Sequence, residues 1–142
     1  MGNYPLPHYH FKVEWGGTNT GFAEVTGLCI ENEVITYRDG SSPGYNTIKM
    51  PGMRKYSNIV LKRGVVKGDL QFYQWMKTIN HNNVERRDVV ISLLNEAHEP
   101  VMTWKVHKAW PCKIQAPDLN ATGNEVALET IELAHEGLEL LE

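Results

Sequence analysis

Arg87-Asp-Val-Val-Ile-Ser-Leu-Leu94 and Val101-Met-Thr-Trp-Lys-Val106 are two apolar runs that decide the fold of this chain. The polar segment Asn95-Glu-Ala-His-Glu-Pro100 separates them, and its length is one that hairpin connections use. The sequence therefore predicts two antiparallel strands joined by a hairpin, and most of the remaining patterns also favour strands.

Strand patterns continue toward the N-terminus. Segment 8–15 alternates between polar and apolar residues, which predicts a half-buried strand. Its apolar face holds Tyr9, Phe11, Val13 and Trp15. Segments 33–38 and 56–63 are shorter and rich in β-forming residues, so each predicts a further strand.

Two segments near the C-terminus are less regular. Segment 109–119 contains Pro111 and Pro117, and proline is excluded from a central ladder unless it lies at a bulge or an edge. We therefore expect an edge or crossover strand there. Segment 125–133 combines leucines and glutamates in a way that suits either a strand or a helix, so its periodicity leaves both open.

One helix interrupts the strand pattern. Asp69 is suited to an N-cap, and apolar residues follow it with helical spacing. They are Phe72, Trp75, Met76 and Ile79. Such a stripe is typical of a helix that covers a sheet or closes a barrel, and we expect packing rather than a cofactor site.

Residues 39–55 show little periodicity and many turn residues, which predicts a long loop. Structureless connections beyond about 12–15 residues are uncommon in compact domains and usually serve a function or are disordered. The apolar residues of this loop are Tyr45, Ile48, Met50 and Met53. They favour contact with a partner surface, either on another chain or on the loop's own domain.

Charge is unevenly distributed. Between Lys49 and Gly68 there are six basic residues and no acidic one, namely Lys49, Arg54, Lys55, Lys62, Arg63 and Lys67. From Glu125 to Glu142 there are six glutamates and no lysine or arginine. Each block could be a solvated face. If the blocks lie at opposite ends of the fold, copies can dock head-to-tail into rings or filaments; if they lie side by side, they neutralise each other.

Composition excludes several classes of protein. The 142 residues carry a formal net charge of −3, which argues against bulk binding to nucleic acid. We expect one domain spanning residues 1–142, with no membrane-spanning helix and no secretory signal. Cys29 and Cys112 are expected to be reduced and to behave as small buried apolar residues.

Signatures of catalysis and of cofactor binding are absent from the sequence. There is no phosphate-binding glycine loop, no His-Glu-x-x-His and no Cys-x-x-Cys. His8 and His10 share a strand face, but no third metal ligand is evident. We therefore expect no enzyme, no cofactor and no metal site.

Seven segments, in order, closely resemble tail tube proteins, the inner-tube proteins of contractile phage tails and of phage-tail-like contractile injection systems. The segments are Gly21-Phe-Ala-Glu-Val-Thr-Gly-Leu28, Tyr37-Arg-Asp-Gly40, Lys49-Met-Pro-Gly-Met-Arg-Lys-Tyr56 with Ile59-Val-Leu-Lys-Arg-Gly64, Arg86-Arg-Asp-Val-Val-Ile-Ser-Leu93, Ala109-Trp-Pro111, Pro117-Asp-Leu-Asn-Ala-Thr-Gly-Asn124 and Glu129-Thr-Ile-Glu-Leu-Ala-His-Glu-Gly-Leu138. The resemblance runs from about His8 to Leu140, nearly the whole chain.

The resemblance implies a mainly β fold, a small β-barrel or sandwich with one flanking helix, in which segment 125–133 is a strand. It implies hexameric rings that stack into a rigid hollow tube, driven through a target envelope and conducting DNA or effector protein. The implied partners are other copies of the chain, the sheath protein, the baseplate and tube-initiator proteins, a terminator or cap, and the cargo. Assembly is expected in the bacterial cytoplasm, within a phage tail or an injection particle that can be released. The alternatives are a type VI secretion tube protein and a soluble β-barrel domain that binds a ligand.

The resemblance also implies contact residues. In related tubes the long loop after the second strand reaches toward the adjoining ring, which makes segment 39–55 an interaction loop. The expected contact residues are Lys49, Met50, Met53, Arg54, Lys55 and Tyr56, with Glu136 and Glu139 as acidic partners on the neighbouring ring. Phage tail and injection machine are not separated by these residues.

Overall fold

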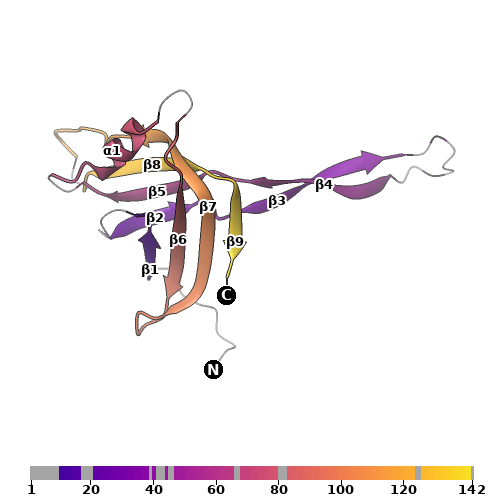
Figure 1. Ribbon diagram of the computed structural model, residues 1–142, viewed down its shortest axis with the longest axis horizontal. Helices are drawn as coiled ribbons and strands as arrows, with labels where there is room; N and C mark the ends of the chain where they lie inside the picture. The colour runs from indigo at the N-terminus through magenta and orange to yellow at the C-terminus, as the bar shows by residue number, and fades with distance from the viewer. Residues whose placement is uncertain are drawn as a thin grey trace.

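The computed structural model describes residues 10–16, 21–38, 40, 44, 47–65, 68–79, 83–123 and 126–141. Within them, strands dominate and one helix is present (Figure 1). The elements are β1 Phe11–Glu14, β2 Phe22–Thr26, β3 Ile30–Tyr37, β4 Ile48–Tyr56, β5 Ile59–Gly64, α1 Gln71–Lys77, β6 Arg87–Leu94, β7 Pro100–Gln115, β8 Leu128–Ala134 and β9 Gly137–Leu140. The predicted mainly β fold with one helix is confirmed. No helix in these ranges is long and apolar enough to cross a membrane.

Strand β7 organises the body of the molecule. The strand order is β1-β6-β7-β8-β5-β2, with β9 also paired to β7, and every pairing is antiparallel. The first part of β7 pairs with β6 and β9, whereas its last part pairs with β8. The β6–β7 hairpin predicted from the sequence is confirmed. Because β7 curves (Figure 1), these two groups of strands lie on different sides of one core.

The part of β7 that contains Pro111 lies at an edge of the β2, β5, β8 group of strands. Strand β7 runs through the two predicted segments without a break, and Pro111 lies opposite Leu133 of β8, beyond the last residue of β7 that pairs with β6. The register shifts between Pro111 and Lys113, so a bulge absorbs the missing donor. The expected edge or crossover strand is therefore confirmed, because β7 crosses from β6 and β9 to β8 and its last part has β8 as its one paired strand in the described chain.

The remaining predicted strands are confirmed with shifted bounds. Strand β1 covers the middle of segment 8–15, with Val13 and the following Trp15 buried. Segment 125–133, which periodicity left open, contains strand β8. The short strands β2 and β9 were not predicted. Residues 8 and 9 lie outside the described part of the chain, so the histidine pair on this strand has no structural outcome.

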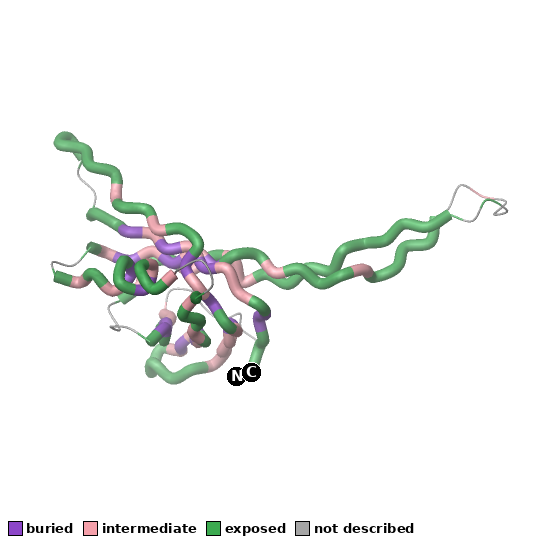
Figure 2. The backbone as a smooth tube through the Cα atoms, turned by 45° about the horizontal axis from the view of Figure 1, so that its top comes forward, coloured by how far each residue is buried: buried purple, intermediate pink, exposed green. Residues whose placement is uncertain are grey.

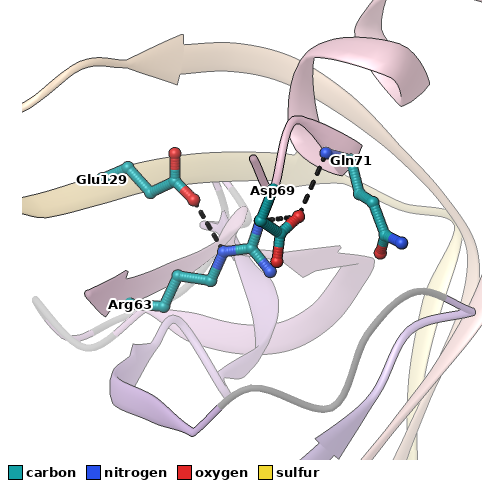
Figure 3. A network of polar contacts seen from close by, with 4 residues as sticks. All are labelled: Arg63, Asp69, Gln71 and Glu129. Atoms are coloured by element: carbon teal, nitrogen blue, oxygen red, sulfur yellow. Dashed lines mark hydrogen bonds and ion pairs between the residues drawn. The ribbon is translucent and has the colours of Figure 1, made fainter. Parts of the chain in front are cut away.

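Helix α1 contributes two aromatic rings to the core. The Phe72 and Trp75 side chains are buried, and both rings lie against Trp15, with centroids 5.0 Å and 5.8 Å away. The N-cap residue is Leu70 rather than the predicted Asp69. Asp69 nevertheless acts at this end, because its Oδ1 accepts a hydrogen bond of 3.3 Å from the Gln71 amide (Figure 3).

A buried ionic network joins strands β5 and β8 to the start of α1. The side chain of Arg63 is 1% exposed, and its Nε donates to Glu129 Oε1 at 2.7 Å (Figure 3). Its Nη2 donates to Asp69 Oδ1 at 3.2 Å, and its guanidinium carbon lies 3.8 Å from the ring centroid of Phe72. The guanidinium therefore has the ionic partners that a buried charge requires. The aromatic ring of Phe72 adds a favourable cation–π contact.

A long two-stranded hairpin, β3 with β4, projects from the body (Figures 1 and 2). We call it the arm. Segment 39–55 was expected to be a loop, but strand structure begins again at Ile48, so the expected loop is too long by nearly half its length. Strand β4 was missed because most of its residues are exposed, so no buried face imposes an alternation. The strand predicted at 33–38 is confirmed as part of β3.

Both cysteines differ from expectation. Cys29 and Cys112 are free, but each is exposed rather than buried. Burial of part of Cys112, together with the charge of Glu132, raises the pKa of its thiol. A thiol with a raised pKa holds less of the nucleophilic thiolate, so Cys112 is not poised for catalysis.

Replacing Glu129 by alanine should cost about 3 kcal/mol of unfolding free energy, because the buried Arg63 guanidinium loses its shortest ionic contact. The matched control is Glu24→Ala, which breaks the exposed 3.4 Å pair with Lys62 and should cost less than about 1 kcal/mol. Urea unfolding of both variants measures the difference. Equal losses would show that the buried network contributes no more than a surface pair.

Replacing Gly27 by alanine should destabilise the root of the arm by about 2 kcal/mol or more, since its φ of +94° disfavours any side chain. The new Cβ would also lie only 2.0 Å from the carbonyl oxygen of Asn58. Gly64→Ala is the control, because a Cβ there meets nothing within 4 Å. Thermal unfolding of the pair tests this, and an unchanged midpoint for Gly27→Ala would contradict it.

Candidate functional site

The two faces of the arm differ in chemistry. Residues directly opposite each other on paired strands share a face, and the register places Ile35 opposite Met50 and Tyr37 opposite Ile48. These four apolar side chains are between 42% and 59% exposed. They form a continuous apolar surface on the outer half of the arm, which we call the apolar face.

The other side of the arm is basic. Arg54 lies opposite Asn32, whose Oδ1 accepts a hydrogen bond of 3.3 Å from Arg54 Nε, and Lys49 lies opposite Thr36. Val34, which is 64% exposed, shares this side. Since the residues of β3 and β4 on this side include no acidic one, this basic face suits an acidic partner.

The sequence-predicted residues of β4 therefore divide between the two faces. Met50 and Lys55 lie on the side of the apolar face, whereas Lys49, Arg54 and Tyr56 lie on the basic side. Met53, where the register shifts, is 76% exposed. The structure brings all six onto strand β4, whereas five of them were expected on a loop.

Tyr56 anchors the arm to the body. Its ring packs against the core cluster and lies 5.6 Å from the ring of His135, which follows β8. His135 Nε2 lies 2.8 Å from the carbonyl oxygen of Ser57, in the link between β4 and β5. Tyr56 is thus half-buried within its own chain, and its position suits fixing the direction of the arm more than contacting a neighbour.

Glu136 and Glu139 lie on the body, each beside a basic group of the same chain. Glu136 pairs with Arg86 at 3.5 Å, and the Glu139 carboxylate lies 3.2 Å from His107 Nε2. Lys55 likewise pairs with Glu33 at 3.0 Å, and this hydrogen bond and charge raise the pKa of the Lys55 ammonium. All these pairs are exposed, and exposed pairs exchange partners at little cost.

The two charge blocks lie side by side where they enter the body. Strand β5 from the basic block pairs directly with strand β8 from the acidic block, and Arg63 is opposite Glu129. Of the two arrangements that the sequence left open, mutual neutralisation therefore holds for β5 and β8. Lys49 and Arg54 lie apart from this neutralised region, on the arm.

The described residues offer little support for metal binding or for binding of a small ligand. They contain no group of three metal-ligating side chains close enough to hold an ion. A groove of about 1100 Å³ lies under the segment between β7 and β8, and Lys62 and Asp118 are the charged residues that line it. No cluster of polar groups converges there as in a ligand pocket.

Sequence reasoning missed the apolar residues of β3 as contact candidates. Ile30, Val34, Ile35 and Tyr37 are all exposed. Their spacing on a predicted strand could have suggested a two-sided ribbon, had the second strand been recognised. Leu119, at 93% exposed, and Val126, at 78%, are further exposed apolar residues near the groove.

Solved structures of contractile injection systems are similar to the whole chain. One is the cryo-EM structure of a PVC sheath–tube complex in the extended state, at 38% identity and a TM-score of 0.89, covering 98% of this chain and 93% of that chain. Another is the tube-terminating cap of the anti-feeding prophage, at 39% identity and a TM-score of 0.88, covering 97% and 91%.

More distant similarity shows the shared fold alone. Hcp1 from Flavobacterium johnsoniae has 14% identity and a TM-score of 0.61, covering 92% of this chain and 94% of that chain. No curated protein matches the chain significantly. The type VI alternative thus shares the fold at much lower identity than the contractile injection systems.

The profile of one protein family matches residues 7–139, and its description is "T4-like virus tail tube protein gp19". The match spans nearly the whole chain and confirms the resemblance drawn from the seven segments. The expectation of a structural protein rather than an enzyme is confirmed with it. The chain therefore belongs to the T4-like virus tail tube protein family.

Proposed function

We propose that this protein forms hexameric rings that stack into the hollow inner tube of a contractile injection particle. The tube is rigid, is driven through a target envelope when the sheath contracts, and conducts its cargo through the bore. The observation that carries this proposal is the arm, a two-stranded ribbon whose two faces are both exposed in the isolated chain.

An isolated two-stranded ribbon is at best marginally stable in water. The arm nevertheless carries a continuous apolar face, and contiguous apolar surface outside the core is typical of an interaction site. A neighbouring copy of the chain that covers the apolar face would supply the second layer that the arm lacks. Burial of apolar surface then provides most of the affinity between copies.

The basic face sets register and polarity in this proposal. Lys49 and Arg54 of the basic face contact acidic residues of the adjoining ring, and Lys55, on the side of the apolar face, is a further contact residue. Glu136 and Glu139 are the first candidates for the acidic partners. Their present partners are exposed and are replaced when rings meet. Each pair contributes only about 0–1 kcal/mol, but a ring of six copies repeats every contact.

The assemblies that contain similar proteins suggest further partners. The similar solved structures are a sheath–tube complex, a tube-terminating cap and a six-fold symmetrised baseplate. We infer that this chain also contacts a sheath protein, a baseplate with its tube initiator, and a terminator. Assembly takes place in the bacterial cytoplasm, and the finished particle acts outside the cell.

Replacing Arg54 and Lys55 by glutamate should block ring stacking, because acidic side chains would then face the acidic residues of the next ring. Negative-stain microscopy of tube lengths measures the effect. Glu136→Lys with Glu139→Lys should partly restore stacking in the same protein. Lys12→Glu with Lys77→Glu is the charge-matched control and should leave tube length unchanged. Unaltered tubes in the first variant would remove the proposed pairing.

Replacing Ile35 and Met50 by threonine should abolish assembly while leaving the isolated subunit within about 0.5 kcal/mol of its original stability, since both side chains are exposed. Sedimentation velocity measures assembly, and urea unfolding measures stability. Tubes that form normally would show that the apolar face is not an interface between copies.

A further inference from the structure

One face of the four-stranded group β2, β5, β8 and the end of β7 is open. Along β5, the buried residues Ile59, Leu61 and Arg63 alternate with half-exposed ones, and β8 shows the same alternation. The buried residues face the core. The other residues form a second surface, which we call the open face, and α1 packs on the core side of these strands.

The register arranges the open face in two rows across the strands. One row contains Glu24, Lys62, Thr130 and Gln115 on β2, β5, β8 and β7. The second row contains Thr26, Val60, Glu132 and Lys113 on the same four strands. Each row thus has one acidic and one basic residue, and its formal charge is zero.

Local contacts hold the charges of the open face in place. The Lys62 ammonium lies 3.4 Å from Glu24 Oε2, and Glu132 Oε2 accepts a hydrogen bond of 2.8 Å from Asn58 Nδ2. Lys113 lies directly across from Glu132 in the β7–β8 register. Lys62 is therefore balanced by Glu24 and Glu132 by Lys113, so neither row carries an excess of one sign.

We propose that the open face is the wall of the tube's bore, and that its balanced charge suits the passage of polypeptide cargo. This inference rests on the proposed tube function. A polypeptide carries charges of both signs, and a neutral wall bearing hydrogen-bonding groups neither holds nor repels it as a whole. Threonine, glutamine and the charged side chains keep the surface wetted, while Val60 is the apolar member of the two rows.

A nucleic-acid conduit makes a different demand on the wall. Double-stranded DNA carries one negative charge per about 1.7 Å of its axis, so unbalanced lysines would bind it and a uniformly acidic wall would repel it from the surface. The open face has neither character, because each of its lysines shares a row with a glutamate. The charge pattern therefore favours polypeptide over nucleic acid.

Cys112 provides a native probe of this surface. Its thiol is exposed, and it lies 3.8 Å from Glu132 Oε2 and from Asn58 Nδ2. Cys29 is the other cysteine of the chain, so a Cys29→Ser variant has Cys112 as its single thiol. A thiol-directed reagent then reports on the open face alone.

The experiment compares three reagents on Cys29→Ser tubes at low salt. A small cationic and a small anionic methanethiosulfonate should modify Cys112 of assembled tubes at rates within about threefold of each other, because a one-sign wall concentrates opposite ions by about tenfold or more. A maleimide attached to a particle wider than the bore should modify free subunits but not the tube interior. The same thiolate attacks both small reagents, so the pKa of Cys112 cancels in the ratio of the two modification rates.

Charge variants test the balance. Glu24→Gln with Glu132→Gln should shift the ratio toward the anionic reagent by about fivefold or more, and Lys62→Gln with Lys113→Gln should shift it toward the cationic reagent. Glu96→Gln with Glu99→Gln removes the same charge from the turn between β6 and β7 and should leave the ratio unchanged. The two opposed variants keep the test valid if one of them fails to fold.

Three results would overturn the inference while tubes still form. The bulky reagent could label assembled tubes along their length, or Cys112 could resist both small reagents because a neighbour covers it. A cationic preference of about tenfold or more would indicate an acidic wall, as suits nucleic acid. Failure to form any tube would instead contradict the proposed function itself.

Discussion

The body of this protein depends on the buried ionic network around the guanidinium of Arg63. The guanidinium lies among apolar side chains, yet it is bound by carboxylates from two other parts of the chain, Glu129 on β8 and Asp69 before α1. A buried charge requires all of its partners at once, so strand β5, strand β8 and the start of the helix are fixed relative to one another. The arm is attached where this fixed unit ends, through Tyr56 and the link to β5. A rigid body is thereby joined to an arm that has no core of its own.

The arm and the body obey opposite constraints, and the contrast explains why the chain is suited to assembly. In the body, apolar residues form a buried core and most charges have partners nearby. In the arm, the apolar face and the basic face lie on opposite sides, and both are exposed. A monomer with this distribution leaves its apolar face in water. Assembly of many copies removes this exposure, because the body of each copy covers the arm of another. In a tube, every copy has such a neighbour.

Much of the fold could be predicted from the sequence because burial imposes periodicity. The β6–β7 hairpin, the half-buried β1 and the aromatic stripe of α1 all have one face in the core, and their patterns were recognised. Strand β4 of the arm was taken for a loop because nothing buries it, so it shows no alternation, whereas the β-forming residues of β3 predicted a strand at 33–38. Arg63 was counted within a basic block, although its position two residues after Leu61 puts it in phase with the core. The contact residues on β4 came from the family resemblance, and their division between two faces required the register with β3.

The central claim is that the arm is structured by other copies of the same chain. Hydrogen exchange of arm amides, compared between isolated subunits and assembled tubes, tests it most directly. The account predicts that amides of β3 and β4 exchange quickly in the subunit and about 100-fold more slowly in the tube, while β5 and β8 change little. Arm amides that exchange equally fast in both states would contradict it.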